Sequence, residues 1–256
     1  MEQAGDDKSK LQSANKTLVL LKHVGIHHVE GIRLTDLVKR SGFDKSTVHR
    51  LLGCLQTEGF VERVPSTKLY RLGIESMQLG FSAANMSPLV EKFRPVMHRI
   101  ARLSEDTVFL VVRSGDDAVY VYRQEGAYPV KAFVAEPGKR RLLGLSAVGV
   151  SMLAQDTDAQ VAALHSRHHQ GYEVQGMSLA VLREHVQFAR KNGYSEMCDF
   201  GPADTAGVGY AFRVSSATRI GVSIAAIRSR MGVRRRRELG QLLQRELAPL
   251  ASTGNR

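Results

Sequence analysis

The stretch LTDLVKRSGFDKSTVHRLLGCL, residues 34–55, decides the fold of the N-terminal part of this chain. Thr35 can cap a short helix, and Gly42 can end it because glycine readily adopts the left-handed conformation found after helices. Asp44 can then cap a second helix that runs through Leu55. Two short helices joined by a glycine-containing turn predict a helix-turn-helix.

The second of these helices has two chemically different faces. Val48, Leu51, Leu52 and Leu55 recur at the spacing of a helical face that packs against a core. The opposite face is polar and cationic, as is typical of a helix that enters the major groove of DNA. An ordinary solvated helix could show the same face, so the adjoining sequence segments decide between a DNA-contacting helix and a merely solvated one. The DNA-contacting residues predicted here are Thr35, Lys45, Ser46, Thr47, His49 and Arg50.

A β-hairpin is expected directly after this helix. Residues 60–63 and 69–72 have strand character, and the PSTK segment between them favours a turn. A helix, a helix-turn-helix and a hairpin in close succession predict a winged helix-turn-helix. Its wing offers three cations to phosphates or the minor groove. They are Arg63, Lys68 and Arg71.

The succession of predicted helices and strands divides the chain into four parts. A linker helix carries Ile74, Met77 and Phe81 as an apolar stripe that could pack on its own domain or on a second subunit. The parts are a disordered tail over 1–12, the winged helix-turn-helix over 13–73, the linker helix over 74–87 and a larger domain over 88–256.

The larger domain mixes helices and strands. Neighbouring strands that are followed by segregated helices predict an antiparallel sheet flanked by helices, and an α+β class for the whole chain. Strands are expected over 107–112, 118–124, 130–135, 207–214 and 220–226. Helices are expected over 89–103, 146–154, 158–165, 179–192 and 233–250.

Composition sets further bounds on function. The formal charge of +11 suits a polyanionic partner, but residues 1–87 hold 12 Lys and Arg against 9 Asp and Glu, while residues 88–256 hold 24 against 16. Net charge therefore only supports the DNA hypothesis, which depends on the pattern. No apolar run is long enough to cross a membrane, and the polar start is unlike a secretory leader, so we expect a cytoplasmic protein.

Motifs for other chemistry are missing. The chain has no phosphate-binding or dinucleotide-binding glycine pattern and no HExxH, so we expect no cofactor, no metal and no enzyme activity. His165, His168 and His169 are interpreted as a solvated loop. The run Arg234 to Arg237 is interpreted as the exposed start of the last helix, although four cations there oppose the helix dipole and an acidic neighbour could offset that cost.

The chain resembles the IclR family of bacterial transcriptional regulators. The resemblance is carried by residues 34–52, by the wing segments EGFVER and YRLG at 58–63 and 70–73, and by LSAVG at 145–149. It implies a GAF-like effector domain, and homodimers or homotetramers that bind inverted-repeat operators.

The resemblance also implies an effector pocket, carried over position by position. Polar groups that the family uses are replaced at Gly209 and Ala225, which suggests a partly apolar ligand, for example an aromatic or acyl acid. The positions implied are Ala147, Val148, Asp199, Gly209, Ser223 and Ala225.

These patterns together predict a sequence-specific DNA-binding regulator that responds to a small organic acid. Two alternatives stay open. The protein could be a ligand-independent repressor with a vestigial sensor domain, or an enzyme that carries a winged-helix appendage.

Overall fold

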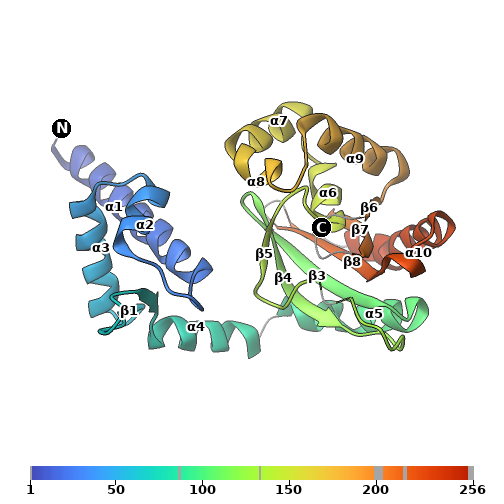
Figure 1. The fold of residues 1–256 in the computed structure, drawn as a ribbon, viewed down its shortest axis with the longest axis horizontal. Coiled ribbons are helices and arrows are strands. Elements are labelled where there is room, and N and C mark those ends of the chain that lie inside the picture. Colours follow the sequence, from blue (N-terminus) through green and yellow to red (C-terminus); the bar gives the residue numbers. More distant parts are fainter. Residues whose placement is uncertain (1, 86–87, 133, 199–203, 216–217, 253–256) are drawn as a thin grey trace. The chain divides into compact units, whose positions relative to one another are not determined.

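The computed structural model describes residues 2–85, 88–132, 134–198, 204–215 and 218–252 (Figure 1). The chain forms two compact units, Met1–Ser87 and Pro88–Arg256. Each unit is described here by itself.

The N-terminal unit is a winged helix-turn-helix. Its hydrophobic core joins the first three helices to the hairpin, and ten buried residues form it, among them Leu20, Leu37 and Tyr70. Strands β1 and β2 pair antiparallel, and Ile32 adds a single bridge to Tyr70. The elements are α1 (Glu2–Ile26), α2 (Leu34–Ser41), α3 (Lys45–Thr57), β1 (Val61–Arg63), β2 (Tyr70–Leu72) and α4 (Ile74–Asn85).

Local signals explain most of these boundaries. Gly42 has φ 70° and ends α2, and the Asp44 carboxylate caps α3 by accepting the Thr47 amide at 2.8 Å. The prediction that Thr35 caps α2 is wrong. That helix begins at Leu34, with Arg33 at the cap position and no side-chain bond, so Thr35 lies inside the first turn.

The polar tail predicted over residues 1–12 is helical from Glu2 onward in the structure. Its Glu, Gln, Ala and Lys residues have high intrinsic helix propensity. The backbone can therefore continue the helix beyond the part of α1 that packs on the core.

The C-terminal unit is built on a six-stranded antiparallel sheet with the order β5-β4-β3-β8-β7-β6. The strands are β3 (Thr107–Ser114), β4 (Asp117–Gln124), β5 (Arg140–Leu142), β6 (Ser195–Cys198), β7 (Thr205–Arg213) and β8 (Arg219–Ile227). The helices are α5 (Pro88–Ser104), α6 (Ala147–Leu153), α7 (Asp158–Arg167), α8 (His169–Glu173), α9 (Leu179–Asn192) and α10 (Val233–Ser252), and Arg228–Arg230 form a 3-10 turn.

Helices cover both faces of this sheet (Figure 1). Helices α5 and α10 bury one face in a core that includes Phe93, Phe212 and Leu243. Helices α6 to α9 bury the other face in a second core that includes Phe109 and Leu153. The predicted antiparallel sheet with flanking helices is confirmed.

The strand predicted over 130–135 is absent from the described residues of that segment. Ala132 and Ala135 are buried, so the apolar run contributes side chains to the core without pairing its backbone in the sheet. The edge strand is Arg140–Leu142 instead, and β6 was not predicted either. Three or four residues are too few to show the alternation that identifies a strand.

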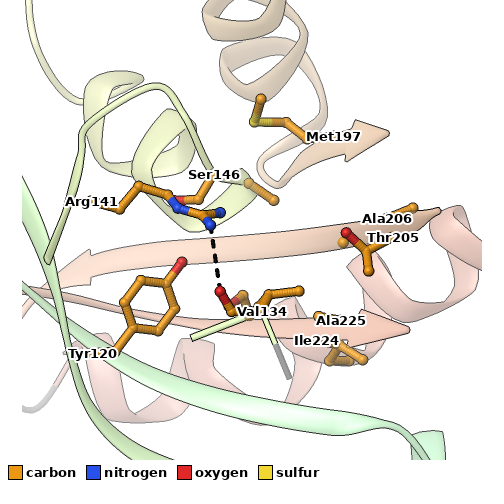
Figure 2. A pocket seen from close by; sticks show the side chains of 12 residues that line it. Tyr120, Val134, Arg141, Ser146, Met197, Thr205, Ala206, Ile224 and Ala225 are labelled. Atoms are coloured by element: carbon orange, nitrogen blue, oxygen red, sulfur yellow. Dashed lines mark hydrogen bonds between the residues drawn. The ribbon is translucent and has the colours of Figure 1, made fainter. Parts of the chain in front are cut away.

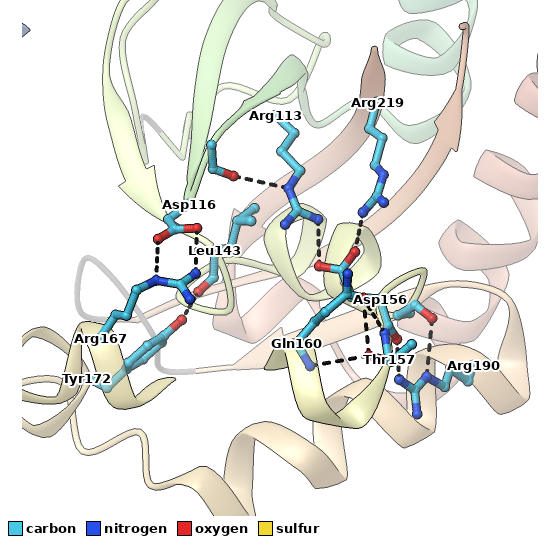
Figure 3. Close-up of polar contacts among 12 residues, drawn as sticks. Arg113, Asp116, Leu143, Asp156, Thr157, Gln160, Arg167, Tyr172, Arg190 and Arg219 are labelled. Carbon is cyan, nitrogen blue, oxygen red and sulfur yellow. Dashed lines mark hydrogen bonds and ion pairs between the residues drawn. The ribbon is translucent and has the colours of Figure 1, made fainter. Parts of the chain in front are cut away.

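Two aspartates tie the helices to the sheet (Figure 3). The Asp156 side chain is only 4% exposed and pairs with Arg113 of β3 at 2.7 Å and with Arg219 of β8. Asp116 accepts two bonds from Arg167, at 3.0 and 3.2 Å. Each acid therefore joins the ends of strands in the sheet to the α6–α8 region.

The arginine run at the start of α10 is paired with acids rather than simply exposed. Arg234 lies 2.9 Å from Glu238, Arg235 lies 2.8 Å from the buried Asp106, and Arg236 lies 3.0 Å from Glu196. These carboxylates offset the unfavourable position of the cations at a helix N-terminus. The interpretation as a merely exposed helix start is therefore wrong for Arg235 and Arg236, which are half-buried.

The three histidines also have partners, and they lie on or between two helices instead of in a loop. His165 contacts the Met177 carbonyl at 3.0 Å, His168 contacts Asp116 at 2.8 Å, and His169 lies 3.6 Å from Glu173. Among the described residues no group of three His, Cys, Asp or Glu could hold a metal ion. None of the described helices is long and apolar enough to span a bilayer.

Candidate nucleic-acid interface and effector cavity

Helix α3 separates its faces as predicted. Val48, Leu51, Leu52 and Leu55 are buried in the core. The opposite side is open to solvent, with Thr47 partly covered. Its exposed predicted residues are Lys45, Ser46, His49 and Arg50.

Two of these polar residues serve the helix cap. The Ser46 hydroxyl donates to the Asp44 carboxylate at 2.6 Å, and the Thr47 amide donates to the same oxygen. These bonds, led by the one from Ser46, hold the pKa of the Asp44 carboxyl well below its ordinary value. The anion therefore persists at neutral pH and keeps the N-terminal turn of α3 closed. Lys45, His49 and Arg50 are left to reach outward.

The hairpin presents its cations unequally. Arg63 is exposed and lies over the Tyr70 ring, with 5.5 Å between the guanidinium carbon and the ring centroid. Lys68 is exposed at the turn with φ 60°. Arg71 is half-buried, and its Nε is buried without a hydrogen-bond partner. Arg63 and Lys68 are thus better placed than Arg71 to meet a phosphate.

A second candidate site is a small cavity in the C-terminal unit, between the N-terminal end of α6 and strands β4, β6, β7 and β8 (Figure 2). It measures about 40 Å³, room for roughly three water molecules. Its lining residues are Tyr120, Val134, Arg141, Ser146, Ala147, Met197, Thr205, Ala206, Gly207, Ser223, Ile224 and Ala225.

Comparison with known proteins identifies a family for both units. The IclR helix-turn-helix domain matches residues 13–65, and the bacterial transcriptional regulator IclR C-terminal domain matches residues 81–248. The chain belongs to the IclR family. This is a family of DNA-binding transcriptional regulators and not of enzymes.

Relatives and solved structures within the family are divergent in sequence. The regulator KipR of Bacillus subtilis is 31% identical over 147 residues, which cover 56% of this chain and 58% of KipR. The structure of a putative IclR regulator from Silicibacter sp. aligns with a TM-score of 0.78 at 24% identity, covering 94% of this chain and 96% of that one. An IclR homologue from Microbacterium hydrocarbonoxydans, complexed with 4-hydroxybenzoate, aligns with a TM-score of 0.63 at 18% identity, covering 93% and 97%.

The cavity contains only part of the set of positions that the IclR resemblance implied. Ala147, Ser223 and Ala225 line it. Val148 is fully buried in the core and lies outside the lining. Gly209 also lies outside the lining, because a Cβ there would come within 2.6 Å of the Val148 Cα. Asp199 falls outside the described residues.

The most polar lining residue was missed by sequence reasoning. Arg141 lies in the three-residue strand β5, which carries no periodicity signal. Tyr120 and Ser146 were also missed as lining residues, although both belong to predicted elements. The signal available for Tyr120 was only strand alternation, which predicts the face of a residue and not its nearness to α6.

Proposed function

We propose that this protein binds an inverted-repeat operator by inserting α3 into the major groove and laying the β1–β2 hairpin against the DNA backbone. The observation that carries the proposal is the two-faced α3. Its leucines are buried, while Lys45, His49 and Arg50 are exposed beside a cationic hairpin. Recognition helices present such a mixture of donors to base edges and phosphates. Binding to chromosomal DNA implies action in the cytoplasm.

Helix α4 supports self-association into a dimer. Ile74, Met77 and Phe81 are 54%, 50% and 60% exposed, and they follow one another at helical spacing. A second copy that covers this stripe would remove apolar surface from water, at about 25 cal/mol per Å². Two copies related by a twofold axis would place two α3 helices in successive major grooves, about 34 Å apart.

The cavity supports a small-molecule effector. It combines hydroxyl groups and one guanidinium with an apolar wall, as ligand sites commonly do. The structure of a family member with 4-hydroxybenzoate bound supports an organic acid as the ligand class. The ligand would shift the stability of subunit arrangements with different α3 spacing, with a coupling of roughly 1–3 kcal/mol.

DNA binding can be tested by selection from random-sequence DNA. Fragments that the protein retains would be sequenced, and the enriched site would be used in a gel-shift assay at physiological salt. Arg50→Ala should weaken binding by about 1–3 kcal/mol, fivefold or more. Lys22→Ala, which removes an exposed charge from α1, is the matched control. Equal affinity of wild type and Arg50→Ala would refute the assignment of α3.

Dimerisation and ligand response are tested separately. Phe81→Ser should raise the fraction of monomer in sedimentation velocity runs if α4 forms the interface. A metabolite panel added to the protein–operator complex should include an acid that alters the affinity. Operator binding that no acid alters would favour the alternative of a ligand-independent repressor.

A further inference from the structure

We propose that Arg141 recognises the carboxylate of the effector and makes the cavity selective for acids over neutral analogues. This inference depends on the proposed effector function of the cavity. Arg141 belongs to none of the positions that the family resemblance implied, so the assignment comes from the structure of this chain.

Among the described residues, the guanidinium of Arg141 has only weak partners. It donates to the Leu145 carbonyl at 3.5 Å and to the Val134 carbonyl at 3.4 Å, both at the outer limit of hydrogen-bond length. Figure 2 shows the side chain reaching into the middle of the cavity. Neither partner carries a charge, so the cation has donors to spare for a ligand.

Neighbouring arginines of the same sheet have carboxylate partners. Arg140 lies 3.0 Å from Asp117, and Arg113 lies 2.7 Å from Asp156. Successive side chains of a strand point to opposite faces, so Arg140 and Arg141 diverge. Arg140 therefore meets an acid of β4, and Arg141 faces the cavity.

The described lining of the cavity holds no acidic side chain. A half-buried cation that has no counter-ion among the described residues has lost part of its hydration without gaining a compensating attraction. A bound anion would supply that attraction. The fork of the guanidinium matches a carboxylate in particular, with two parallel bonds.

The remaining lining determines the rest of the ligand. Met197, Ile224 and Ala225 offer an apolar wall, and the hydroxyls of Tyr120 and Ser223 can bond one further polar atom. The small volume admits a carboxylate and only a few adjoining atoms. The ligand class is therefore a compact monocarboxylate with an apolar body, whose larger members would extend through the open side of the cavity.

The test is isothermal titration calorimetry of the full-length protein with paired probes. Acetate, pyruvate, benzoate and 4-hydroxybenzoate are each compared with the corresponding amide, which has nearly the same shape but no charge. The variants are Arg141→Met, Arg141→Lys and, as a control with the same loss of charge outside the cavity, Arg140→Met. Circular dichroism melting verifies that each variant is folded.

Wild type should bind at least one acid at least tenfold more tightly than its amide. Arg141→Met should lose that tenfold preference, Arg141→Lys should retain part of it, and Arg140→Met should keep it fully. If Arg141 only braced the Val134 segment, the Met variant would bind acid and amide more weakly by the same factor, and the inference would be wrong.

Failure of the inference differs from failure of the proposed function. If wild type binds an acid and its amide equally, or if Arg141→Met keeps the preference, Arg141 has no role in recognition, while the effector site survives. If wild type binds none of the acids but still binds the operator in the gel-shift assay, the effector function and this inference are both wrong. The DNA-binding function is then still supported.

Discussion

Gly209→Ala is expected to destabilise the C-terminal unit strongly, although it adds a single methyl group. A Cβ at this position would lie 2.5 Å from the Val148 backbone nitrogen and 2.7 Å from the Ala147 carbonyl carbon. The first distance is about 0.9 Å less than the 3.4 Å at which ordinary contact begins. The obstructing atoms are backbone, so no side-chain rotation relieves the clash.

Neither side of this contact can move away easily. Gly209 pairs with Ser195 of β6 and Ser223 of β8, so β7 is held on both edges. The Ser195 hydroxyl also bonds the Ala147 carbonyl, which ties the start of α6 to β6. Overpacking of this kind costs about 1–3 kcal/mol, and a rigid backbone contact belongs at the upper end. Lower entropy of the unfolded chain returns about 0.4–1 kcal/mol, which leaves a net loss of about 2 kcal/mol.

Thermal unfolding would be followed by circular dichroism, because the chain has no tryptophan to report by fluorescence. A loss of about 2 kcal/mol corresponds to a fall in Tm of about 4–8 °C for a unit of this size. Gly171→Ala is the control, since its Cβ would meet only the Leu142 side chain, at an ordinary 3.7 Å. It should be neutral or slightly stabilising, as alanine favours a helix over glycine. Equal Tm values for the two variants would refute the argument.

Two further predictions concern charged groups. Asp156→Ala should lower the free energy of unfolding by roughly 3 kcal/mol, because Arg113 and Arg219 would lose their shared anion. Urea titration measures this free energy, and a change below about 0.5 kcal/mol would contradict the prediction. Burial lowers the pKa of His185 below its ordinary 6.5 against the opposing effect of Glu184 and Glu196, so its contribution to stability is complete above pH 6.5 and declines as the pH falls toward its folded pKa. His185→Gln should therefore reduce the loss of Tm between about pH 7.5 and 5 relative to wild type, and parallel curves for the two proteins would disprove the assignment.

The N-terminal unit was predictable because its signals are local. The leucine face of α3, the Asp44 cap and the left-handed Gly42 all act within one or two helical turns. Each is therefore visible in a short window of sequence. Long, periodic elements of the C-terminal unit were equally clear, and α9 has the predicted bounds Leu179–Asn192.

The cavity depended on contacts between distant segments, and sequence patterns contain little information about them. Gly209 was predicted to line a ligand site because of the family resemblance, yet the first turn of α6 packs directly against it. Arg141 was overlooked because β5 is too short for a pattern.

The sequence by itself determined most of the residues that cap or end the helices and those that helices bury, since propensity and periodicity act between near neighbours in the chain. Only the tertiary structure decided which cations are neutralised. Arg235 meets Asp106 across 129 positions, whereas within the described part of the chain Arg141 meets only two carbonyl groups. The sequence gives the charge of each side chain. The ion-pair partner of that side chain depends on how strands and helices that are far apart in the sequence come together in the fold.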